Sequence, residues 1–122
     1  MEEILRKIKE SFDYLLSLKK GWDDEDGDPI NRQSFCKAME FLFKLINDVG
    51  VVNELRIDPG VDGNIDIEIH NDNYRLLIQI SDNINSWYGD NGFNLDKIKD
   101  SSKEIHNKEL FDWIKKNMLY KI

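Results

Sequence analysis

Residues 65–80 read IDIEIHNDNYRLLIQI, and this stretch decides the fold. Apolar side chains occupy every second position of residues 65–69 and, after an Asn-Asp-Asn turn, every second position of residues 74–80. Because successive side chains of a strand point to opposite faces, each run predicts a strand with one apolar face and one polar face. The short turn between the runs predicts that the two strands pair antiparallel.

The same alternation extends to both sides of this hairpin. Residues 54–58 alternate in the same way, and the Pro-Gly and Asp-Gly pairs of residues 59–63 predict the turn that follows. A further strand is predicted over residues 84–88, before the Gly-Asp-Asn-Gly turn of residues 89–92. We therefore expect an antiparallel meander of about four strands, one face of which needs a cover.

Helical patterns flank the meander on both sides. Residues 2–20 place apolar side chains at i, i+3 and i+4 spacing, and a second helix follows between an Asn31 N-cap and a Gly50 stop. A last helix is predicted to begin at Ser101, where Ser-x-x-Glu matches a capping box. Segregated helices and strands predict an α+β fold, with two N-terminal helices, the meander, and a C-terminal helix packed on one sheet face. We expect residues 1–122 to form a single domain.

The composition excludes several classes of protein. The 122 residues carry 17 Lys and Arg against 24 Asp and Glu, for a net charge of −7, whereas general nucleic-acid binding needs a basic surface. A single cysteine cannot form an internal disulfide or a cysteine-based zinc site. No apolar run approaches the ~18 residues of a membrane span, and the N-terminus is charged from its second residue, unlike a signal peptide. We therefore expect a cytoplasmic protein.

The negative charge is unevenly spread along the chain. Residues 53–96 carry nine acids against two arginines, and the loop at residues 22–28 carries five acids and no base, whereas the helical segments are nearly balanced. Acids that alternate with apolar residues lie on the polar face of the sheet, so they predict an electronegative surface able to steer a basic partner. The alternative is a solvated acidic face that serves solubility alone.

The candidate partner-binding residues come from these two acidic regions. In the loop they are Asp23, Asp24, Glu25 and Asp26, and on the sheet they are Asp66, Glu68 and Trp87. Adjacent strand residues face opposite ways, so one of Trp87 and Tyr88 faces outward and could contact a partner. The alternative is that the aromatic side chain packs across the strand pair or under the last helix.

Catalytic and cofactor chemistry finds little support in the sequence. An EF-hand reading of the acidic loop places Trp22 at the first ligand position and Gln33 at the twelfth, so two calcium ligands are missing. Cys36, on a predicted helix, is expected to be buried, and neither His70 nor His106 has a sequence-level partner for a nucleophilic dyad. No phosphate-binding, zinc-protease or nucleophile-elbow motif occurs. We expect no enzyme activity, no metal and no cofactor.

Three elements of the chain resemble a widespread group of small bacterial and phage proteins. The group shares a Gly-Trp-Asp-Gly-x-Gly-Ala-x-Pro-Ile segment, an Asp-Gly-x-Ile strand and a hairpin ending near an aromatic-Tyr pair. Residues 21–30, 58–68 and 87–90 match these elements, with departures at Asp24 and Asp28, where the group has small residues. The resemblance implies a fold and a mobile-element or defence-system context, and it carries no activity.

These observations favour a small acidic binding protein. The leading hypothesis is an inhibitor of a basic-surfaced nuclease or toxin, as immunity proteins, antitoxins and phage anti-defence inhibitors are, with no direct contact to nucleic acid or membrane. A second hypothesis is a self-associating structural or accessory protein of a mobile element whose sheet edges pair between copies. A third, a divalent-metal-dependent enzyme, requires a metal-dependent change in thermal stability.

Overall fold

The computed structural model of the chain describes residues 2–50, 54–71, 73–81, 84–90, 95–100 and 108–118. It has the expected α+β architecture, with helices first, then strands, then a helix. The elements are α1 (Glu2–Ser17), α2 (Arg32–Asp48), β1 (Glu54–Pro59), β2 (Ile65–His70), β3 (Arg75–Ile80), β4 (Ile84–Asp90), β5 (Leu95–Asp100) and α3 (Lys108–Asn117).

The ends of α2 follow the sequence signals, whereas α1 ends earlier than predicted. The Asn31 side chain accepts a hydrogen bond of 2.7 Å from the backbone N–H of Ser34, which caps α2. The N–H of Gly50 donates to the carbonyl of Leu45 and closes the other end. Helix α1 ends at Ser17 rather than at residue 20, because the next residues form tight turns in which the N–H of Trp22 donates to the carbonyl of Lys19.

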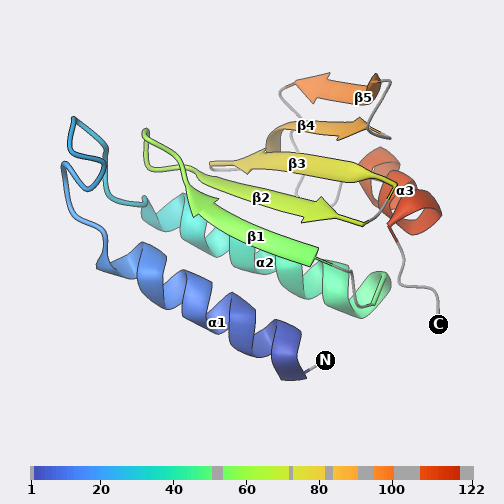
Figure 1. Ribbon diagram of the computed structural model, residues 1–122, viewed down its shortest axis with the longest axis horizontal. Helices are drawn as coiled ribbons and strands as arrows, with labels where there is room; N and C mark the ends of the chain where they lie inside the picture. Colours follow the sequence, from blue (N-terminus) through green and yellow to red (C-terminus); the bar gives the residue numbers. More distant parts are fainter. Residues whose placement is uncertain are drawn as a thin grey trace.

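The strands form one antiparallel sheet in the order β1-β2-β3-β4-β5 (Figure 1). The meander therefore contains a fifth strand, β5, beyond the roughly four that the alternation predicts. In the central pair, Ile67 lies opposite both Ile57 of β1 and Ile78 of β3, so apolar residues of neighbouring strands share one face.

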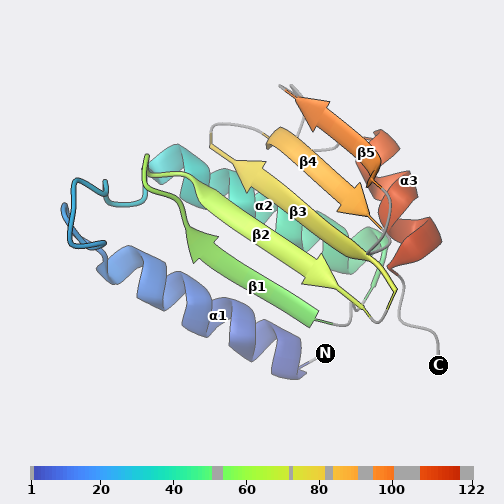
Figure 2. The same ribbon diagram turned by 45° about the horizontal axis from the view of Figure 1, so that its top comes forward.

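All three helices cover that apolar face of the sheet (Figure 2). Helix α1 lies along β1, and α2 lies behind β2 and β3. The buried sheet side chains that contact them are those predicted from the alternation. They are Leu55, Ile57, Ile65, Ile67, Ile69, Leu76, Ile78 and Ile80. The opposite face of the sheet is covered by no element that the structure describes.

Helix α3 closes the core at the β4 side. The ring of Trp113 packs on that of Trp87, with centroids 6.1 Å apart, and Phe111 contacts Phe41 of α2 at 5.5 Å. The Asn71 amide donates to the carbonyl of Asn117 and so ties the β2–β3 turn to the end of α3. The predicted helix start at Ser101 lies outside the described residues.

Candidate functional site

The uncovered face of the sheet carries the polar side chains of the first four strands. Burial alternates residue by residue along β2 and β3 and along the first four residues of β1, so one face of these strands is buried and the other is open. The side chains on this open face are Glu54, Arg56, Asp58, Asp66, Glu68, His70, Arg75, Leu77, Gln79, Ser86 and Tyr88. Two of the predicted site residues, Asp66 and Glu68, are therefore on one exposed surface.

An acidic pair lies at the end of the open face next to the β1–β2 turn. Asp58 and Asp66 are directly opposite in the antiparallel register. Asp66 is half-buried, and this burial, together with the charge of Asp58, raises the pKa of its carboxyl above the ordinary 3.8. Asn64 donates a hydrogen bond of 3.3 Å to Asp66, and no cation among the described residues lies within ion-pair distance of it.

A single arginine partly neutralises two of the sheet acids, Asp58 and Glu68. Arg56 lies 3.2 Å from the carboxylate of Asp58 and 4.0 Å from that of Glu68. At the far end of the same strands, His70 contacts Glu54 at 2.9 Å. The open face is thus acidic at the Asp58 end and mixed at the His70 end, rather than uniformly anionic.

The centre of the open face is apolar and aromatic. Leu77 of β3 is exposed and lies directly opposite Tyr88 of β4. The guanidinium of Arg75 lies over the Tyr88 ring, 5.7 Å from its centroid. Leu77 is not among the site residues predicted from sequence. Its place beside Tyr88 follows from the pairing of β3 with β4, which the residue type of Leu77 does not reveal.

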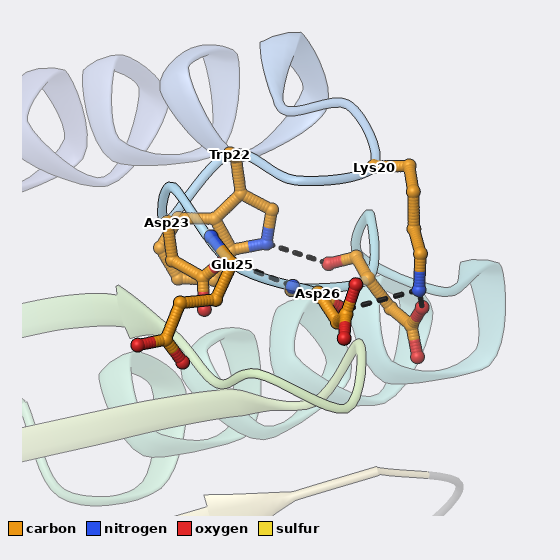
Figure 3. Close-up of polar contacts among 7 residues, drawn as sticks. Lys20, Trp22, Asp23, Glu25 and Asp26 are labelled. Carbon is orange, nitrogen blue, oxygen red and sulfur yellow. Dashed lines mark hydrogen bonds and ion pairs between the residues drawn. The ribbon is translucent and has the colours of Figure 1, made fainter.

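The loop between α1 and α2 is held by its own polar contacts (Figure 3). The Asp23 carboxylate accepts hydrogen bonds from the N–H groups of Gly27 at 2.8 Å and Glu25 at 3.1 Å. These bonds, that from Gly27 first, lower the pKa of Asp23 below 3.8. The Trp22 indole donates to the carbonyl of Asp28 at 2.7 Å, and Lys20 pairs with the Asp28 carboxylate at 2.7 Å. The Asp23 carboxylate therefore holds the shape of the loop.

The three middle acids of the loop are exposed. Asp24 adopts a left-handed backbone with φ of 65°, at the position where the resembling group has glycine. The Glu25 side chain extends away from the contacts of the turn (Figure 3), and the carbonyl of Asp26 accepts from Lys20. Of the four predicted loop residues, Asp24, Glu25 and Asp26 present their carboxylates to solvent.

Backbone hydrogen bonds bring the loop and the β1–β2 turn together. The N–H of Asp28 donates to the carbonyl of Val61 at 2.9 Å, and the N–H of Asn31 donates to the carbonyl of Gly63 at 3.0 Å. Both segments lie at the same end of the molecule (Figure 2). We call the carboxylates of the loop, of the β1–β2 turn and of the adjoining strand ends the acidic corner. They are Asp24, Glu25, Asp26, Asp58, Asp62 and Asp66.

Trp87 is not part of this surface. Its side chain is only 1% exposed and faces the helices, because Trp87 lies opposite the buried Ile78. Tyr88 takes the outward position instead, so the alternative of an aromatic packed under the last helix holds for Trp87. The expectation for Cys36 is also wrong, because the thiol is exposed.

The described residues bring together no group of three or more His, Cys, Asp or Glu side chains that could hold a metal ion. In the same residues, no helix has the length and apolar character needed to cross a membrane. The comparisons find no matching family model, no similar curated protein and no similar solved structure.

Proposed function

We propose that the chain is a non-enzymatic binding protein that docks its acidic corner and open sheet face on a basic surface of another protein. Nucleases and many toxins expose positive grooves that bind phosphates, and an acidic protein that covers such a groove inhibits it. A nuclease or toxin is therefore the partner class that best fits the charge.

The cross-strand pair of Asp58 and Asp66 carries this proposal. Like charges directly opposite each other destabilise a sheet, and burial adds to the cost of ionising Asp66. An arrangement that opposes folding is common where a residue serves binding. Arg56 already pairs with Asp58, and a lysine or arginine of a partner would neutralise Asp66, for which no ion pair is seen among the described residues.

The apolar centre of the open face supports a protein partner over a small ion. Tyrosine contributes strongly to protein interfaces, and Tyr88 with Leu77 offers a contact patch between charged rows. Arg75 holds the Tyr88 ring from one side, which limits the side-chain freedom lost on binding. The acidic residues would then steer the encounter, and the apolar centre would stabilise the complex.

The test uses charge-reversal variants of immobilised protein. Wild-type protein captures the partner from a host extract, mass spectrometry identifies it, and calorimetry measures its affinity for each variant. We expect Asp66→Lys to weaken binding by about thirtyfold or more, since breaking a buried charge pair costs roughly 2–5 kcal/mol. Asp26→Lys measures the contribution of the loop separately from that of the sheet.

The matched control is Glu3→Lys, which makes the same charge change at an exposed position of α1. It should change the affinity by less than about threefold, because rim and remote charges contribute little. The sheet face is not the docking surface if Asp66→Lys binds the partner as tightly as wild type does, or if Asp66→Lys and Glu3→Lys lose affinity equally.

A further inference from the structure

We draw no further inference here: the strongest candidate, the lysine-lined cleft between α2 and α3, carries none, because Lys44 and Lys108 already pair with aspartates of their own helices and nothing among the described residues shows which ligand would fill the cleft.

Discussion

Gly89 lies in the interior of β4, where a side chain would collide with the indole of Trp113. A Cβ at this position would be 2.6 Å from the nearest ring carbon. We expect Gly89→Ala to lower the free energy of unfolding by about 1–3 kcal/mol, because the overpacked ring must shift against its neighbours. Urea unfolding measures the change.

The control for Gly89 is a double-mutant cycle with Trp113→Leu, which removes the colliding ring. The two substitutions should be clearly less than additive, because the alanine then meets empty space. Additive effects would show that the glycine is needed for its backbone and not for the approach of Trp113.

Asp66 couples stability to pH in a direction opposite to that of most carboxylates. Its folded pKa lies above 3.8, so the folded protein holds its proton to higher pH than the unfolded chain does. The destabilisation is therefore fully present above the raised pKa and disappears as the pH falls below 3.8. We expect Asp66→Asn to stabilise the protein by about 0.5 kcal/mol at neutral pH, the scale of a like-charge cross-strand pair.

Thermal unfolding at about pH 7 and about pH 3 checks the prediction for Asp66→Asn, whose amide oxygen keeps the acceptor for Asn64. The gain should be present at the higher pH and absent at the lower. A variant less stable than wild type at neutral pH would mean that the carboxylate stabilises the fold, and the argument from Asp66 to a basic partner would fail.

At the scale of elements, the junction between the acidic loop and the β1–β2 turn depends on Gly63. Its backbone φ is 83°, and a Cβ would be 2.9 Å from the carbonyl oxygen of Pro29. We expect Gly63→Ala to cost about 2 kcal/mol or more, since a left-handed residue and a backbone collision are combined. Limited proteolysis should then cut the loop at residues 22–28 faster than in wild type, whereas equal cleavage would mean that the loop holds its position without the turn.

The same junction gives two segments of the resembling pattern a structural role. Residues 21–30 and the turn before β2 contact each other through the backbone bonds of Asp28 and Asn31. Gly89, in the third segment, accommodates Trp113. These contacts give Gly63 and Gly89 a packing role, whereas Asp24, Glu25 and Asp26 are exposed.

Strands with strict alternation could be predicted from sequence, and those shaped by pairing could not. The burial of Ile65, Ile67 and Ile69 follows directly from period 2. Residues 95–100 have only a weak alternation, and they form a strand because β4 offers them an edge. Such a strand depends on its neighbour more than on its own residues.

The position of Trp87, a predicted partner-binding residue, could not be derived from sequence either. A single register shift in β4 decides which face of the sheet its side chain occupies. Ile80 pairs with Ile84, but Gln79 pairs with Ser86, so β4 carries one extra residue at this point. Counting by twos from Ile84 places Trp87 on the outer face, whereas the bulge moves it inward opposite Ile78. The sheet acids Asp66 and Glu68 lie in a strand without a bulge, and their outward position was correctly predicted.

At the scale of the whole molecule, the net charge of −7 should make partner binding sensitive to salt. Docking of the acidic corner on a basic partner depends on attraction between unlike charges, which salt screens over about 8–10 Å. We expect this affinity to fall by about tenfold or more between about 50 and 500 mM salt. Affinity that is unchanged over this range would contradict an electrostatic partner.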